Sequence, residues 1–136
     1  MFTPRLLVLA GFMRILGAEF VRHYPLRLIN IHPSLLPRFR GLHTHERALS
    51  GGVSTHGCTV HFVTPELDDG PIILQAEVPV LATDSAETLQ QRVHQAEYVA
   101  YPRAIHWFAN QRLTVIDGKV LLDGAEQPQQ HFSLPG

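Results

Sequence analysis

The sequence has a single cysteine, Cys58, among 136 residues, and its longest apolar runs are far too short to span a membrane. A lone cysteine excludes a disulfide within the chain, so a reducing cytoplasm fits this composition. The first residues do not combine a charged segment with an apolar core, so we expect no signal peptide. We therefore expect a cytoplasmic protein that does not bind membranes.

Charge is also scarce. Charged residues make up 17% of the chain, the net charge is −1, and no run of like charges occurs. This argues against nonspecific binding to nucleic acid and leaves small anionic substrates open. With 45% hydrophobic residues, the chain is long enough for one domain with a core and too short for two. We expect one domain over residues 1–136.

Two kinds of catalytic motif are missing. No serine or cysteine lies in a nucleophile-elbow setting, so an attacking atom would belong to a substrate. Nine histidines are present, five of them between His32 and His61, which could suggest a zinc site. No His-Glu-x-x-His pattern accompanies them, and we expect no metal.

Hydrophobic patterning predicts an α/β fold with a mixed sheet. Residues 5–11 are almost continuously apolar, as in a parallel strand covered on both faces, and residues 26–30 form a second apolar run. Residues 58–64 alternate, with Cys58, Val60 and Phe62 on one face, and should form an antiparallel hairpin with residues 71–80. Asp117-Gly118 should join a terminal hairpin of residues 113–116 and 119–122.

Helices are predicted at three places. Residues 17–24 should form a short one that Pro25 ends, and Thr44 should cap another that runs to about Ser50. A capping box at residues 84–87 should open a long helix to about Asn110, bent or divided at Pro102. Its inner stripe would be Leu89, Val93, Ala96, Ala100 and Ala104. The tail from about Gln127 has no periodicity and should be loose.

The strand at residues 5–10 creates a further expectation. A parallel strand of this kind needs neighbours on both sides, and the chain begins as if in the middle of a domain. Unpaired backbone groups and apolar cover on its open side would attract another strand. We therefore expect this strand to pair with another chain, as in a homo-oligomer, or the protein to be only marginally stable.

Asn30-Ile31-His32-Pro33 is the segment with the most chemical content. Side chains two apart on a strand point to the same side, so Asn30 and His32 would present an amide and an imidazole together. Pro33 should end the strand there, at a carboxyl end, where open α/β sheets bind their ligands.

The two groups suit a carbonyl whose oxygen becomes negative during attack, as in acyl transfer between two bound small molecules. A carboxylate from residues 65–70 would orient His32 and favour its protonated form.

Each of these groups also has a plainer interpretation. An Asn or His at a strand end is more often a turn-former or a satisfied polar residue, and an Asp-Gly loop is often just a solvated turn. His94 and Glu97, three apart on a helix, could be an exposed polar stripe.

Four motifs taken together are more specific. They are Asn30-Ile31-His32-Pro33-Ser34-Leu35-Leu36-Pro37, Gly41-Leu42-His43-Thr44-His45, His56-Gly57-Cys58-Thr59-Val60-His61-Phe62-Val63 and Glu66-Leu67-Asp68-Asp69-Gly70-Pro71-Ile72-Ile73. The sequence from about Leu6 to Leu122 closely resembles the phosphoribosylglycinamide formyltransferases of purine synthesis. The resemblance implies a doubly wound, Rossmann-like formyltransferase fold, here its carboxyl-terminal part, without the phosphate-binding loop with which the family opens.

The resemblance also implies an activity and a site. The family transfers a formyl group from 10-formyltetrahydrofolate to the amine of glycinamide ribonucleotide, without a metal. Asn30, His32 and Asp68 resemble its catalytic trio, and His94 and Glu97 match positions that meet the ribonucleotide. Residues resembling those around the folate are Met13, Arg14, Ile15, Leu16, Asn30, Thr64, Pro65, Glu66, Leu67 and Asp68.

Two alternatives stay open beside this activity. The chain could be a truncated, non-catalytic module that binds folate or another protein. It could also be a related formyltetrahydrofolate hydrolase.

Overall fold

The computed structural model describes residues 7–9, 28–64 and 69–135. Five strands form one mixed sheet in the order β1-β2-β3-β4-β7. Their bounds are Leu7–Leu9 (β1), Leu28–His32 (β2), Thr55–Phe62 (β3), Ile72–Pro79 (β4) and His131–Ser133 (β7). β1 pairs with β2 in parallel, and β2, β3 and β4 pair antiparallel. The expected α/β fold, with parallel strands followed by an antiparallel hairpin, is therefore confirmed. The predicted helix at residues 17–24 lies outside the described residues.

β2 begins and ends close to where the sequence predicted. It runs two residues beyond Asn30 and stops at His32, directly before Pro33, which has no N–H to donate to the sheet. Its neighbour β1 lies at the edge of the sheet as far as the described strands show. The backbone of β2 thus places Asn30 and His32 at its carboxyl end.

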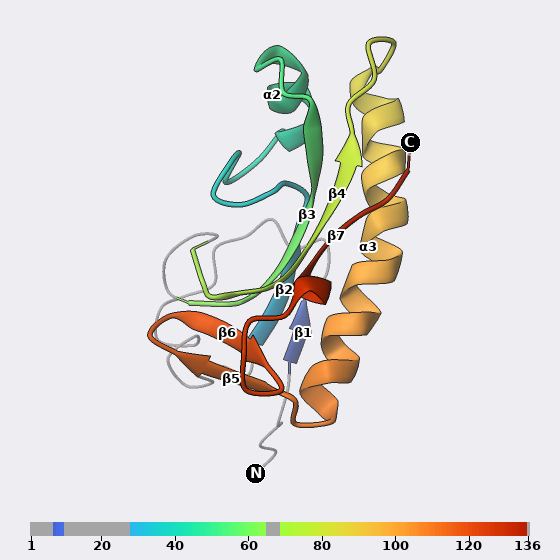
Figure 1. Ribbon diagram of the computed structural model, residues 1–136. Helices are drawn as coiled ribbons and strands as arrows, with labels where there is room; N and C mark the ends of the chain where they lie inside the picture. Colours follow the sequence, from blue (N-terminus) through green and yellow to red (C-terminus); the bar gives the residue numbers. More distant parts are fainter. Residues whose placement is uncertain (1–6, 10–27, 65–68, 136) are drawn as a thin grey trace.

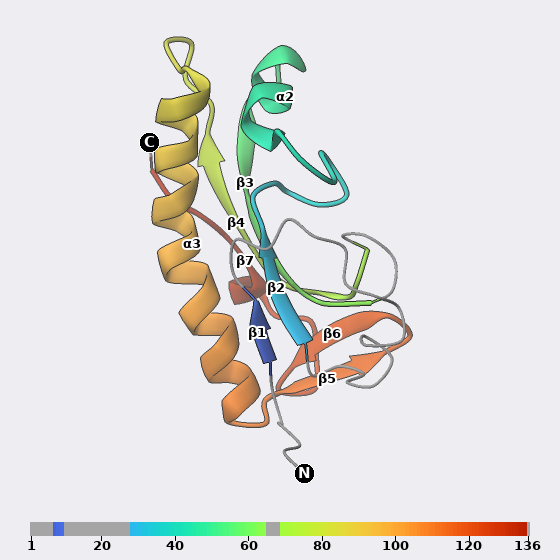
Figure 2. The same ribbon diagram turned by 180° about the vertical axis from the view of Figure 1, so that it is seen from behind.

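A long helix covers one face of the sheet, as Figures 1 and 2 show from opposite sides. This helix, α3, spans Ala86–Ala109 and is continuous through Pro102, which does not divide it. The predicted inner stripe is confirmed, since all five of its residues are fully buried, and Trp107 extends it. These side chains pack on the alternate residues Cys58, Val60 and Phe62 of β3, together with residues of β4, to form the core.

The predicted caps of both helices are wrong by one residue. α2, Thr44–Ser50, is preceded by His43 in the left-handed conformation, with no side-chain cap, and Thr44 is buried inside the first turn. In α3 the cap is Ser85, which forms a capping box with Thr88. Asp84 is not the cap because its carboxylate accepts from Leu81 N and Arg92 instead.

The carboxyl-terminal part is more ordered than the sequence predicted. β5 (Leu113–Ile116) and β6 (Lys119–Leu122) form the expected hairpin, with positive φ angles at both Asp117 and Gly118. The tail was expected to be loose, which is wrong. A 3₁₀ turn, Pro128–Gln130, leads into β7, which pairs with β4 in parallel. Gln130 fixes the turn by donating to the carbonyls of Ile73 and Val120, contacts that a search for periodicity does not detect.

Among the described residues, no helix is long and apolar enough to cross a membrane.

Candidate active site

A cavity of about 590 Å³ opens where the carboxyl end of β2, the start of α2 and one face of α3 meet. This volume lies within the range typical of small-molecule sites. β2 contributes Ile31 and His32 to the wall. α2 and the residue before it contribute His43, Thr44, His45 and Glu46. From α3 come Gln90, His94, Glu97, Tyr98, Tyr101, Pro102 and Ile105.

His32 is held in one orientation by the loop that follows it. The residue is only 4% exposed, and its Nε2 lies 2.8 Å from the carbonyl oxygen of Phe39. A carbonyl can only accept, so Nε2 carries a proton. Ser34 binds the same loop through the carbonyls of Arg38 and Phe39. The loop therefore fixes the ring beside the cavity before any ligand arrives.

Asn30 lies on the same face of β2 as His32 but is not part of the cavity wall. Its backbone pairs with His61 of β3, and His32 pairs with Thr59, two residues away in the register. Its Oδ1 atom is buried and has no hydrogen-bond partner among the described residues. A buried acceptor without a partner costs about 1–3 kcal/mol, so a ligand that donates to it would gain that energy.

His94 and Glu97 both line the cavity, so they are not just an exposed stripe on the helix. His94 Nε2 lies 3.8 Å from Glu97 Oε2, which confirms that the two share one face of α3. Burial raises the pKa of Glu97 above its usual value, although the neighbouring His94 acts in the opposite direction. A partly desolvated carboxylate of this kind is a strong acceptor for ligand hydroxyl or amine groups.

The structure brings only some of the predicted residues together. Met13, Arg14, Ile15, Leu16, Pro65, Glu66, Leu67 and Asp68 lie outside the described residues. Thr64 follows β3 next to Val63, whose N–H donates to Leu28 at the amino end of β2, so it is remote from the cavity wall. Asp69, the next residue after the predicted catalytic Asp68, is half exposed and accepts from Arg40 at 2.6 Å.

The sequence analysis missed the parts of the wall that come from α2. His43 and His45 were considered as part of a possible zinc site and of a family motif, and were given no role at the cavity. Within residues 28–64 and 69–135, no three histidine, cysteine or acidic side chains are placed to hold a metal ion. The signal that could have identified them is their position at the start of a helix that follows the Pro33 loop. That helix must turn back over the end of β2.

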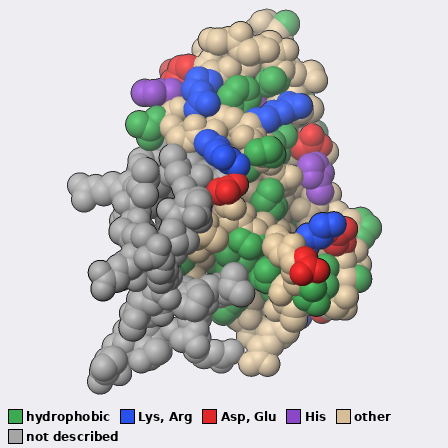
Figure 3. Space-filling model, turned by 90° about the vertical axis from the view of Figure 1, so that its left-hand side faces the viewer, with side chains coloured by type: hydrophobic (Ala, Val, Ile, Leu, Met, Phe, Trp, Pro, Cys, Tyr) green, Lys and Arg blue, Asp and Glu red, His purple; other side chains and the backbone are tan. Residues whose placement is uncertain are grey.

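The face of the molecule in Figure 3 has no large area of one charge among the described residues. On the face in Figure 3, basic and acidic side chains are interspersed, in keeping with the net charge of −1. Long-range steering by a charged patch on this face is therefore not expected.

Comparisons with known proteins agree with these observations. The family model described as "Formyl transferase" matches residues 1–105. The phosphoribosylglycinamide formyltransferase of Escherichia coli (strain K12) is 53% identical over 133 residues, which cover 98% of this chain and 63% of that enzyme. The chain thus spans less than two thirds of this relative's length.

Solved structures give the same picture. The phosphoribosylglycinamide formyltransferase of Anaplasma phagocytophilum superposes with a TM-score of 0.89 at 45% identity, covering 95% of this chain and 63% of the other. A formyltetrahydrofolate deformylase from Pseudomonas syringae superposes with a TM-score of 0.83 at 37% identity. The match covers 87% of this chain and 40% of the deformylase chain.

Proposed function

Because this chain belongs to the formyl transferase family, we propose that it transfers the formyl group of 10-formyltetrahydrofolate to the amine of glycinamide ribonucleotide, in purine biosynthesis. The observation that carries the proposal is the position of His32. Its oriented ring lies at the end of β2, two residues after Asn30, on the wall of a ligand-sized cavity that His94 and Glu97 also line. The relatives named above bear the name of this activity.

The reaction needs no covalent bond to the protein. The substrate amine attacks the formyl carbon, a C–N bond forms, and the formyl oxygen becomes an oxyanion. The amide of Asn30 and protonated His32 donate hydrogen bonds to this oxyanion. Asp68 supports the charge on His32 and relays the proton that the amine loses, through water. The bond from the formyl carbon to the folate nitrogen then breaks, and that nitrogen takes up a proton.

The two substrates are assigned to different groups. The ribonucleotide contacts His94 and Glu97, because a carboxylate on the cavity wall can accept from its hydroxyl groups. The folate contacts Met13 to Leu16, Asn30 and Thr64 to Asp68. Neither assignment requires a metal. The small molecules, rather than nucleic acid or membrane, are the partners, and the proposed compartment is the cytoplasm.

A direct assay tests the proposal. The purified chain is mixed with both substrates under single-turnover conditions, and formylated ribonucleotide is measured. Binding of each substrate is measured separately by titration calorimetry, with a folate analogue in place of the formyl donor. We expect formyl transfer and binding of both. A folded protein that binds neither molecule and transfers nothing would contradict the proposal.

The same experiment distinguishes the two alternatives. The structural similarity to a deformylase favours hydrolysis, which would appear as formate released without an amine acceptor. A non-catalytic folate-binding module would bind the folate analogue and not the ribonucleotide.

We also propose that β1 pairs with another chain through the side that no described strand covers. Sedimentation velocity tests this, and a stable monomer at micromolar concentration would contradict it.

A further inference from the structure

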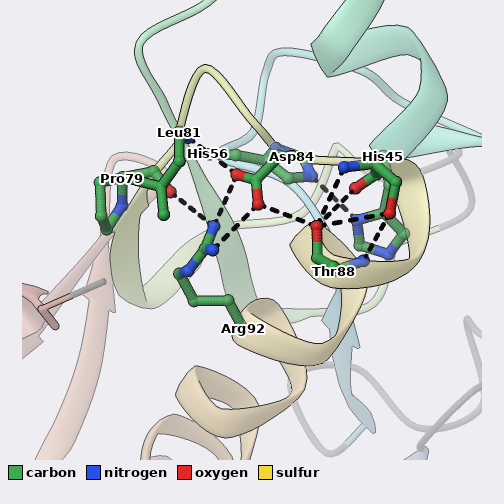
Figure 4. Close-up of polar contacts among 8 residues, drawn as sticks. His45, His56, Pro79, Leu81, Asp84, Thr88 and Arg92 are labelled. Atoms are coloured by element: carbon green, nitrogen blue, oxygen red, sulfur yellow. Dashed lines mark hydrogen bonds and ion pairs between the residues drawn. The ribbon is translucent and has the colours of Figure 1, made fainter.

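Two histidines from separate elements, His45 and His56, are in contact at the cavity wall. His45 lies in the first turn of α2 and His56 near the start of β3, and the two residues are 8% and 1% exposed. His45 Nδ1 lies 3.2 Å from His56 Nε2, with the two rings nearly perpendicular (Figure 4). Of the two, only His45 reaches the cavity.

Two nitrogens at this distance form a hydrogen bond only if one of them carries a proton. Burial lowers the pKa of His56 to about 4 and also lowers that of His45, so both rings are neutral at pH 7. Each neutral ring has one N–H and one lone pair. Either His56 donates through Nε2–H to His45, or His45 donates through Nδ1–H to His56.

The other nitrogen of His56 distinguishes these arrangements. His56 Nδ1 is buried and has no hydrogen-bond partner among the described residues. The ring of Phe39 lies edge-on against His56 and supplies no acceptor of ordinary strength. If His45 were the donor, Nδ1 of His56 would be a buried N–H without a partner, which is rare in proteins. If His56 is the donor, Nδ1 is only a lone pair.

We propose that His56 is a positioning residue that holds His45 as the Nε2–H tautomer, so that His45 presents a hydrogen-bond donor to the cavity. His45 Nε2 has no partner within the described part of the chain, and Nδ1 is occupied by His56. A donor at this place suits an oxygen of the bound ligand. The identity of that ligand as the ribonucleotide rests on the proposed function, whereas the tautomer does not.

This role gives His45 a property that a solvent-exposed histidine lacks. In water either ring nitrogen can carry the proton, and the ring also becomes charged below about pH 6.5. Here the bond from His56 fixes one tautomer, and burial keeps the ring neutral. The wall would therefore offer the same donor at neutral pH, next to His32 and Glu97.

Nuclear magnetic resonance of the ¹⁵N-histidine-labelled chain tests the tautomer without any ligand. We expect a lone pair on His45 Nδ1, a proton on His45 Nε2, and a scalar coupling between His45 Nδ1 and His56 Nε2 across the hydrogen bond. A proton on His45 Nδ1, or no coupling, would overturn the proposal. The result does not depend on whether the chain binds a substrate, so failure here and failure of the proposed function are distinguishable.

Two variants test the consequence for binding. His56→Gln keeps an N–H donor near the position of Nε2, and His56→Leu removes it. We expect His56→Leu to weaken glycinamide ribonucleotide binding about tenfold, with little change for the folate analogue, and His56→Gln to restore most of the loss. Equal weakening by both variants, or equal loss for both ligands, would overturn the proposal. Amide spectra of each variant verify that it is folded. If a variant is not folded, the scalar coupling between His45 and His56 in the wild-type chain decides whether the proposal holds.

Discussion

Arg92, in the second turn of α3, donates to both carboxylate oxygens of Asp84, at 2.7 and 2.9 Å. The Asp84 side chain is only 2% exposed and also accepts from Leu81 N and Thr88 Oγ1, as Figure 4 shows. Arg92 also donates to the carbonyl of Pro79 at the end of β4. One ion pair thus fixes the amino end of α3 to the sheet, and with it the helix that carries His94 and Glu97.

The first prediction concerns the stability of this junction. Asp84→Asn removes the charge while Arg92 stays largely buried, so we expect the free energy of unfolding to fall by about 2 kcal/mol. Asp123→Asn is the matched control, because Asp123 also accepts two bonds from an arginine, Arg112, but at the exposed surface. The control should change little. Urea unfolding measures both, and equal losses would contradict the importance of burial.

The second prediction is a loss of stability in mild acid. The pKa of His56 is lowered by burial from 6.5 to about 4, so the unfolded chain binds more protons between these values. Stability is therefore complete above about pH 6.5 and falls as the pH decreases toward 4, by about 2 kcal/mol between pH 7 and pH 5. His56→Gln should remove most of this slope in urea unfolding at the two pH values. An unchanged slope would contradict it.

The ion pair of Asp84 acts in a different pH range. Hydrogen bonds from Arg92 hold the pKa of Asp84 well below its usual value, so its contribution is present above about pH 3.9 and is lost only at lower pH. The loss from His56 can therefore be measured without interference from this ion pair.

Features that depend on residues close together in the sequence were predicted correctly, whereas contacts between different elements were not. The turn of the β5–β6 hairpin is specified locally by Asp117-Gly118, and the buried stripe of α3 by spacing within one helix, so both were predicted. Asp84 and Gln130 were misjudged because their partners, Arg92 and the Ile73 carbonyl, lie on other elements. The His45–His56 contact likewise joins two elements and has no local pattern.

The third prediction concerns catalysis. Asn30→Ala and His32→Gln each remove a proposed oxyanion donor, so each should lower kcat by about 100-fold or more and change KM less. His106→Gln is the control, since His106 is exposed near the far end of α3 and contacts Asn110. Formyl transfer at saturating substrate measures the effect. A decrease of less than about threefold in either variant would remove that residue from the proposed site.

The last prediction concerns the glycine that follows the two aspartates. A Cβ on Gly70 would lie 1.6 Å from the carbonyl oxygen of Phe62, the last residue of β3. The clash is with backbone, so no side-chain rotation relieves it, and Phe62 N also donates to Pro71. Gly70→Ala must therefore displace residues 69–71 from β3, next to the proposed catalytic Asp68.

We expect Gly70→Ala to lower both kcat and the affinity for a folate analogue at least tenfold, and to lower the free energy of unfolding by about 2 kcal/mol or more. Gly51→Ala is the control, because a Cβ there would lie 3.2 Å from Arg47 O, 3.6 Å from the Phe39 ring and 3.8 Å from Ala48 O, in a helical backbone conformation. Unfolding and binding are measured on both variants. If Gly70→Ala keeps its folate affinity while losing stability, the close approach to β3 serves only the fold, and the loop does not position Asp68 for the reaction.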